Sequence, residues 1–222
     1  MARQPATVAV PATPSTPAQR DRYERILDVA TAVLAAGGED ALQMKDLPAQ
    51  ANVSLATLYR YFPSKEHLLL AIAVDRYEKA YRRILAEPAR GGSVRDRVTG
   101  FLLREFGAEQ RNQKLTAALH RVLTDTSRDH AEVLERLAYL HRQMLLAVAE
   151  AGGPLSARQQ QVLPVVAAVF GDATRQWLAG VASAADARFQ IRTGCRLLDL
   201  PDHVIGEDLE QSAPAGTSTT AR

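Results

Sequence analysis

The chain has 222 residues, of which 46% are apolar and only 5% aromatic, and its formal net charge is +2. This length supports one large or two small domains with a real core. The near-neutral balance excludes bulk charge as a source of nucleic-acid affinity, so any such contact depends on where the charges lie. Abundant Ala and Leu, with almost no strand-like alternation, predict an all-α fold.

The single cysteine, Cys195, excludes an internal disulfide and a cysteine-based metal site. No apolar run approaches the roughly 20 residues that a membrane span needs. The short apolar patch at residues 8–10 is broken by Pro11 and is too short for a signal peptide. We therefore expect a cytoplasmic protein with no membrane partner.

The first 18 residues are rich in Pro, Ala, Thr and Ser and show no periodicity, which predicts a disordered arm over residues 1–18. Arg3 could reach DNA from such an arm, but a plain tail is the favoured interpretation. A helix is predicted over residues 19–36, ending at the pair Gly37 and Gly38. Its apolar residues recur at helical spacing: Ile26, Leu27, Ala30, Val33 and Leu34.

Two short helices predicted over residues 44–51 and 55–61 flank a tight turn at Asn52, a residue type that tolerates the left-handed conformation. Ser54 is expected to cap the second of these helices. Pro48 lies inside the first one, so we expect that helix either to begin late or to bend.

A longer helix follows, beginning after a cap at Ser64 and stopping before Pro88. A Gly-containing loop comes next. The sequence as a whole shows no internal repeat and no run of coiled-coil length. Residues 206–222 are small and polar and predict a disordered tail. The remaining predicted helices cover residues 94–110, 113–123, 129–151, 157–181 and 186–200. Pro164 is expected to bend the helix at residues 157–181.

The segment T-L-Y-R-Y-F-P-S-K-E-H-L-L, residues 57–69, follows the turn at a fixed distance. Together with the three-helix start it resembles the TetR family of bacterial transcriptional regulators. The resemblance implies a three-helix DNA-binding module with a helix-turn-helix at residues 19–66. It also implies a six-helix ligand-binding and dimerisation domain at residues 67–205. Family members bind a near-palindromic double-stranded DNA operator as homodimers, with the second helix of the motif in the major groove.

By this resemblance, nine residues are candidates for DNA contact. Hydroxyl groups and cations would fix the register on phosphates, while small apolar groups could meet a thymine methyl. Residues 20–65 contain six basic and six acidic side chains, so DNA binding requires the two signs to lie on opposite faces. The candidates are Lys45, Ser54, Leu55, Ala56, Thr57, Tyr59, Arg60, Tyr61 and Lys65.

In the second domain, eight residues combine apolar bulk with a few polar groups, which is typical of a pocket for a mostly apolar small molecule. Each of them also fits a plain core position. The predicted ligand-binding residues are Phe101, Phe106, His120, Tyr139, Met144, Phe170, Thr174 and Trp177.

The helices predicted at residues 157–181 and 186–200 carry broad apolar faces. The resemblance implies that they pair with their copies in a four-helix homodimer interface. The alternative is burial of these faces within one chain. His120 and His141 lack metal-ligand spacing, so we predict no metal site.

No nucleophile–base pair, carboxylate pair or Gly-rich phosphate loop supports catalysis, so we predict a protein that is not an enzyme and has no catalytic residues and no cofactor. The motifs are most similar to those of actinobacterial repressors of sterol and lipid catabolism, which implies a sterol-derived or acyl-CoA-type effector. The leading hypothesis is a repressor that a small-molecule effector releases from DNA. A transcriptional activator, or a helical small-molecule-binding protein with a vestigial DNA module, remains open.

Overall fold

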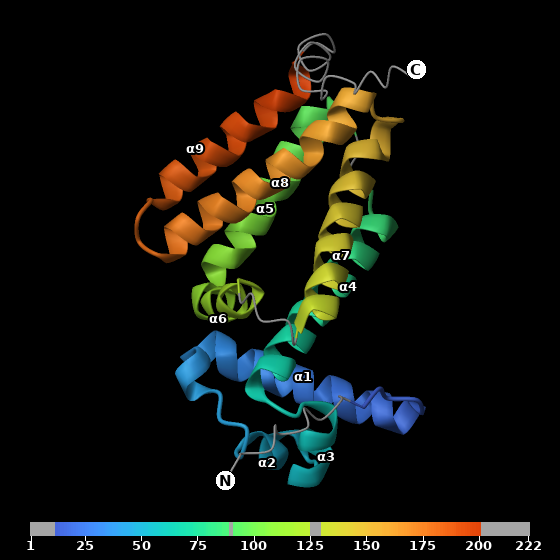
Figure 1. Ribbon diagram of the computed structural model, residues 1–222, viewed down its shortest axis with the longest axis vertical. Coiled ribbons are helices and arrows are strands. Elements are labelled where there is room, and N and C mark those ends of the chain that lie inside the picture. The colour runs from blue at the N-terminus through green and yellow to red at the C-terminus, as the bar shows by residue number, and fades with distance from the viewer. Residues whose placement is uncertain (1–11, 89–90, 125–129, 201–222) are drawn as a thin grey trace, which may run out of the picture. The chain divides into compact units, whose positions relative to one another are not determined.

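A computed structural model describes residues 12–88, 91–124 and 130–200 of the chain. All α-helices within these ranges are shown in Figure 1, and the described residues form no strand, which confirms the predicted all-α class. Short 3₁₀ turns occur at Glu39–Ala41, Glu150–Gly152 and Arg196–Asp199. The helices are α1 (Pro17–Gly37), α2 (Leu47–Ala51), α3 (Leu55–Tyr61), α4 (Lys65–Ala86), α5 (Val94–Arg111), α6 (Gln113–Leu123), α7 (Ala131–Ala149), α8 (Ala157–Leu178) and α9 (Ala184–Cys195).

The helices fall into two compact units, which we describe separately. Unit 1 holds the described residues of Met1–Glu87 and Arg104–Met144, and unit 2 holds those of Pro88–Leu103 and Leu145–Arg222. Helices α5 and α7 contribute residues to both units. The functional boundary expected after residue 66 stays a prediction. The expected tail, and residues 1–11 of the expected arm, lie outside the described residues.

Helix α1 begins at Pro17, two residues earlier than expected, because the residues before it form a complete capping box. The Thr16 hydroxyl accepts from the Gln19 backbone N–H at 3.3 Å, and the Gln19 side chain accepts from the Thr16 N–H at 3.3 Å. The helix stops at Gly38, whose φ of 79° suits a residue without a Cβ. Its apolar side is buried, as the periodicity predicts: Ile26, Leu27, Ala30 and Leu34.

Helix α2 begins at Leu47, three residues later than the predicted start at Met44. Pro48 thereby occupies the first turn, where the backbone N–H of an ordinary residue would have no intrahelical partner. The late start is one of the two outcomes expected for this proline. As a consequence, Lys45 is not a helical residue; it lies in the turn before α2.

The turn between α2 and α3 has the backbone conformation that the sequence predicts. Asn52 has φ 51° and ψ 54°, in the left-handed region. The carbonyl of Pro48 accepts from the N–H of Val53 at 3.0 Å. The Ser54 hydroxyl caps α3 by accepting from the Thr57 N–H at 3.1 Å. Helix α3 then spans Leu55–Tyr61, as predicted.

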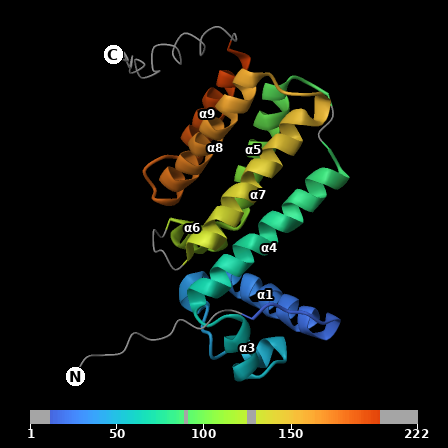
Figure 2. The same ribbon diagram turned by 45° about the vertical axis from the view of Figure 1, so that its right-hand side comes forward.

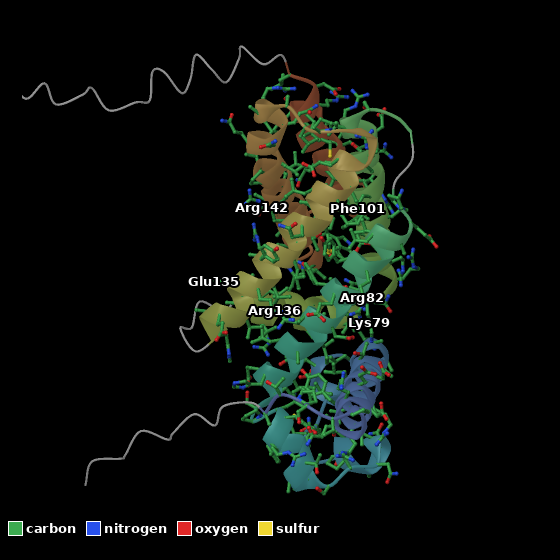
Figure 3. All side chains as sticks on the ribbon, turned by 90° about the vertical axis from the view of Figure 1, so that its right-hand side faces the viewer. Lys79, Arg82, Phe101, Glu135, Arg136 and Arg142 are labelled. Atoms are coloured by element: carbon green, nitrogen blue, oxygen red, sulfur yellow. The ribbon has the colours of Figure 1, made fainter. Side chains whose placement is uncertain are left out.

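Helix α4 begins after Ser64, whose hydroxyl accepts from the His67 N–H at 3.3 Å. In unit 1 an ion pair between Glu78 of α4 and Arg136 of α7 connects the two helices; Arg136 is labelled in Figure 3. The rings of Tyr77 and His141 meet edge to face, 5.9 Å apart. Burial is the main cause that raises the pKa of Tyr77 to about 12.

Helices α8 and α9 lie side by side in unit 2, as both Figures 1 and 2 show. Close approach is possible because Gly194 has no side chain: a Cβ there would lie 2.9 Å from Val169 Cγ1. Helix α8 continues from Ala157 to Leu178 through Pro164. Helix α9 is shorter than expected and ends at Cys195, where a 3₁₀ turn takes over.

Two buried arginines bind backbone carbonyls at the ends of helical segments in unit 2. Arg158 donates to the carbonyls of Leu197 and Leu198 at 2.8 and 2.9 Å. Arg97 donates to the carbonyls of Val148 and Ala149 at 3.3 and 2.7 Å. Both satisfy carbonyls at the end of a helix or 3₁₀ turn, which have no intrahelical donors.

Candidate nucleic-acid interface

One face of α3 is exposed although it carries large side chains. Leu55 is 47% exposed and Tyr59 is 43% exposed, while Leu58 on the opposite side is fully buried. Ala56 and Arg60 are also exposed, and the helix contains no acidic residue. The face therefore presents apolar, hydroxyl and cationic groups together, the combination that contacts base edges and phosphates.

The two hydroxyl side chains at the start of α3 are joined to each other. Ser54 Oγ lies 2.8 Å from Thr57 Oγ1, in addition to accepting from the Thr57 backbone N–H. A hydroxyl has one donor and two acceptor sites, so the pair retains capacity for a phosphate oxygen. Ser54 is therefore both the cap of α3 and a candidate contact.

The ammonium group of Lys65 already has one partner. Its Nζ donates to the carbonyl of Glu39 at 2.9 Å, and the side chain is half-buried. Two further N–H donors of the ammonium remain for a phosphate. Glu39 in turn binds Arg121, with Nε 2.7 Å from Oε2, so this carboxylate is neutralised within unit 1.

Tyr61 departs from its predicted role as a direct DNA contact, because its side chain is only 2% exposed. Its ring packs edge to face against Tyr23 at 5.6 Å. The hydroxyl of Tyr61 accepts from Arg60 at 3.2 Å, and the Arg60 guanidinium lies 4.9 Å from the ring centre. Tyr61 is thus a core residue whose polar end orients the exposed Arg60.

A contact that the sequence pattern does not reveal involves the segment before α1. The backbone N–H of Ala12 donates to the carbonyl of Arg60 at 3.0 Å. Ala12 itself packs against the core of unit 1. The segment thereby satisfies one carbonyl at the end of α3, where intrahelical donors are missing. No periodicity or motif near Ala12 signals this bond.

The eight predicted ligand-binding residues divide between the two units. Their grouping around one pocket therefore stays a prediction. Tyr139 of α7 is 61% exposed, so burial does not support its place in a pocket wall, which stays a prediction. The others are buried or half-buried: Phe106, His120 and Met144 in unit 1, and Phe101, Phe170, Thr174 and Trp177 in unit 2.

Two histidines of unit 1, His120 and His141, are partly buried. Burial lowers the pKa of His120 and of His141, because the protonated imidazole is poorly solvated there. Within the described ranges, no group of three or more His, Cys, Asp or Glu side chains is arranged to hold a metal ion. The described helices likewise include none with the length and apolar content to cross a bilayer.

Two surface features of unit 2 were not predicted. An open pocket of about 500 Å³ between α5 and α9 is lined by seven residues, none of which belongs to the predicted ligand set. Phe189 of α9 and Val181 are 67% and 76% exposed. The spacing of Arg192 and Arg196, four residues apart on one chain segment, is the only sequence signal of the pocket.

These features define a helix-turn-helix DNA-binding protein: the turn at Asn52, the cap of α3 and the exposed face of α3. Residues 26–72 match the family described as "Bacterial regulatory proteins, tetR family". Residues 91–198 match the description "Tetracyclin repressor-like, C-terminal domain". The chain belongs to the TetR family of transcriptional regulators.

Two of the similar proteins are transcriptional repressors. The chain is 32% identical over 181 residues to the HTH-type transcriptional repressor KstR of Mycolicibacterium smegmatis, covering 82% of this chain and 88% of that relative. It is also 32% identical over 181 residues to KstR of Mycobacterium tuberculosis, covering 82% of both chains. The expected family and its similarity to DNA-binding repressors are thereby confirmed.

Solved structures show the same fold. A TetR transcriptional regulator from Rhodococcus sp. RHA1 superposes with a TM-score of 0.71 at 27% identity, covering 82% of this chain and 97% of the other. FadR from Bacillus subtilis, solved in complex with stearoyl-CoA, has a TM-score of 0.61 at 15% identity, covering 79% and 97%. The second likeness concerns the fold alone.

Proposed function

We propose that this protein is a homodimeric transcriptional repressor that binds a near-palindromic DNA operator and is released from it by an apolar small molecule. The observation that carries the proposal is the exposed face of α3, with Leu55 and Tyr59 uncovered beside Arg60. An uncovered leucine and tyrosine beside a cation on one short helix suit a nucleic-acid surface, and a major groove accepts a helix of this kind.

The proposed DNA contacts follow the structure. Leu55 and Ala56 meet base edges, and Thr57, Tyr59 and Lys65 hold phosphates. Arg60, oriented by its hydrogen bond to the Tyr61 hydroxyl, contacts a base or a phosphate. Lys45, exposed in the turn before α2, contacts the backbone.

The proposed dimer uses the outer sides of α8 and α9. Of the apolar faces, Val166 and Ile191 are buried within the chain, whereas Val165 is 49% exposed and Phe189 is 67% exposed. The uncovered residues support association with a second copy. In such a dimer, two copies of α3 would enter successive major grooves about 34 Å apart.

The proposed effector is an apolar small molecule or an acyl-CoA-type metabolite, in line with sterol or lipid catabolism. Two observations support this class. Two relatives that match 82% of this chain are KstR repressors. The FadR structure of the same fold contains stearoyl-CoA. Release from DNA would follow because the effector binds better to the conformation with low operator affinity.

The experiment is a binding titration of the full chain with DNA from upstream of its own gene, at several salt concentrations. We expect affinity to fall steeply with salt, because phosphate contacts release counterions. Tyr59→Phe should weaken binding about tenfold or more, since one hydrogen bond to a charged group is lost.

The matched control is Tyr139→Phe, which removes a hydroxyl from another exposed tyrosine. It should bind DNA like the natural protein. Equal binding by all three proteins would contradict the proposed role of Tyr59. Absence of any salt-dependent DNA binding would instead favour a small-molecule-binding protein with a vestigial DNA module.

A further inference from the structure

The open pocket between α5 and α9 brings three arginines together within unit 2. Arg95 comes from the first turn of α5, Arg192 from the last turn of α9, and Arg196 from the 3₁₀ turn that follows. The pocket measures about 500 Å³ and is open to solvent on one side. The complete lining is Arg95, Asp96, Thr99, Gly100, Leu103, Arg192 and Arg196.

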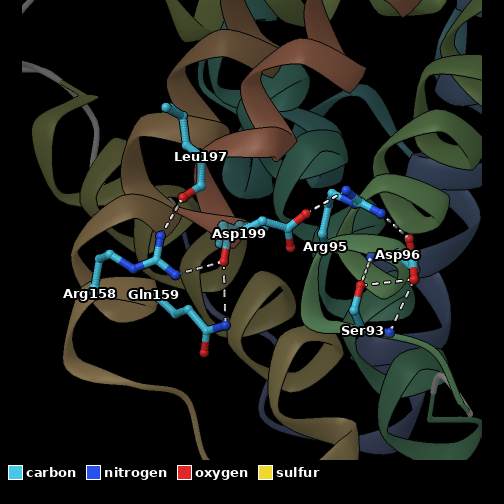
Figure 4. A network of polar contacts seen from close by, with 8 residues as sticks. Ser93, Arg95, Asp96, Arg158, Gln159, Leu197 and Asp199 are labelled. Carbon is cyan, nitrogen blue, oxygen red and sulfur yellow. Dashed lines mark hydrogen bonds and ion pairs between the residues drawn. The ribbon is translucent and has the colours of Figure 1, made fainter. Parts of the chain in front are cut away.

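The acidic groups beside the pocket are already engaged (Figure 4). Asp199 forms an ion pair with Arg95. Asp96 accepts from the backbone N–H and the hydroxyl of Ser93 at 3.2 and 2.8 Å, and Arg95 approaches its other oxygen at 3.4 Å. Arg95 is thereby held by two carboxylates, and among the described residues no ion pair joins either carboxylate to the two other arginines.

Arg192 and Arg196 are exposed and, among the described residues, neither guanidinium group has a hydrogen-bond or ion-pair partner. Two like charges four residues apart repel each other mildly. The helix dipole favours a cation in the last turn of α9, which accounts for Arg192. It does not account for a second arginine beyond the helix end that lines the same pocket. Three guanidinium groups against two carboxylates leave one positive charge in excess there.

The other side of the pocket supplies a hydroxyl group and space. Thr99 lines the pocket and lies beside the buried Cys195. Gly100 adds no side chain, and Leu103 gives an apolar wall. A hydroxyl in the same pocket lining as two guanidinium groups suits a ligand with several strong acceptor oxygens.

We propose that this pocket binds the phosphate group of a small molecule, with Arg192 and Arg196 as its principal ligands. A guanidinium presents a planar fork of donors that matches phosphate oxygens in pairs. A phosphate offers three such oxygens where a carboxylate offers two, which fits two arginines and a hydroxyl. The site is separate from the DNA contacts and from the predicted ligand residues, so it goes beyond the function proposed above.

The test is isothermal titration of the full chain with sodium pyrophosphate, with ADP and with adenosine, in the absence of DNA. We expect both phosphate compounds to bind and adenosine not to bind. Arg192→Gln with Arg196→Gln should weaken pyrophosphate and ADP binding by at least about tenfold, since two charge-assisted interactions are lost. Arg175→Gln is the matched control, because that exposed arginine of α8 binds Asp172 outside the pocket.

The comparison of ligands identifies the source of the phosphate. Equal affinity for pyrophosphate and ADP would indicate a free phosphate ligand, and tighter binding of ADP would indicate a nucleotide. Either result supports the proposal. Equal binding of adenosine and ADP, no binding of either phosphate compound at millimolar concentration, or undiminished binding by a double variant with native circular dichroism would overturn it. None of these outcomes depends on whether the protein binds an operator.

Discussion

At the scale of single residues, local chemistry accounts for most of the helix-turn-helix. Ser54 and Ser64 lie one residue before α3 and α4 and accept from backbone N–H groups, as serines at such positions do. Tyr61 shows the limit of reasoning from a motif. Its place beside Arg60 and Tyr59 suggests an outward side chain, but the helical repeat turns it into the core of unit 1.

Asn52 gives the sharpest residue-scale prediction, because it is the only described non-glycine residue with positive φ. Asn52→Ala should lower the free energy of unfolding by about 1 kcal/mol, since the left-handed region costs most L-residues about 1–2 kcal/mol. Asn52→Gly should leave it within about 0.5 kcal/mol, because glycine adopts this conformation freely. Urea denaturation of both variants measures the difference. Equal stabilities would show that backbone strain at the turn is unimportant.

At the scale of elements, neighbours decide where helices end and how closely they pack. Helix α2 begins late because Pro48 is tolerated only in a first turn. Helices α8 and α9 approach closely because Gly194 faces Val169. Arg97 and Arg158 then hold the ends of α7 and of the final 3₁₀ turn by binding their carbonyls. None of these contacts follows from periodicity alone.

Substituting alanine for each of two glycines in the α8–α9 pair should change the stability of the protein in opposite directions. Gly194→Ala should destabilise the protein by about 1–3 kcal/mol, because its Cβ would overlap Val169 and force the helices apart. Gly171→Ala should stabilise it by about 0.5–1 kcal/mol, because it is helical and no heavy atom lies within 4 Å of the added Cβ. Thermal unfolding distinguishes them. Stability unchanged in Gly194→Ala would contradict the close packing.

At the scale of the whole molecule, the proposed repressor is a homodimer and therefore requires a second copy of the chain. Buried Val162, Val166 and Ile191 show that much of the apolar surface of α8 and α9 serves the chain's own core. The two interpretations of the apolar faces are therefore not exclusive. The inward residues stabilise unit 2, and the exposed Val165 and Phe189 are available for the proposed contact with a second copy.

Phe189→Asp should convert a dimer into a monomer, because burying a carboxylate in an apolar interface is strongly unfavourable. Light scattering coupled to size exclusion measures the mass. Operator affinity should fall at the same time, since each half-site then binds alone. Tyr139→Asp, on the exposed surface of α7, is the control that should stay dimeric. A dimeric Phe189→Asp protein would move the proposed interface elsewhere.

The sequence by itself determined the all-α class, the helix-turn-helix and the family, because these depend on short-range signals. Caps, turns and apolar periodicity act within a few residues of one another, and the segment from Thr57 to Leu69 keeps the family's spacing. Only the tertiary structure decided which side chains are covered. It buried Tyr61, left Tyr139 and Phe189 exposed, and brought Arg95 to Arg192 across ninety-odd residues of sequence. Burial and convergence depend on which helices pack together, and residue order along the chain does not specify that packing locally.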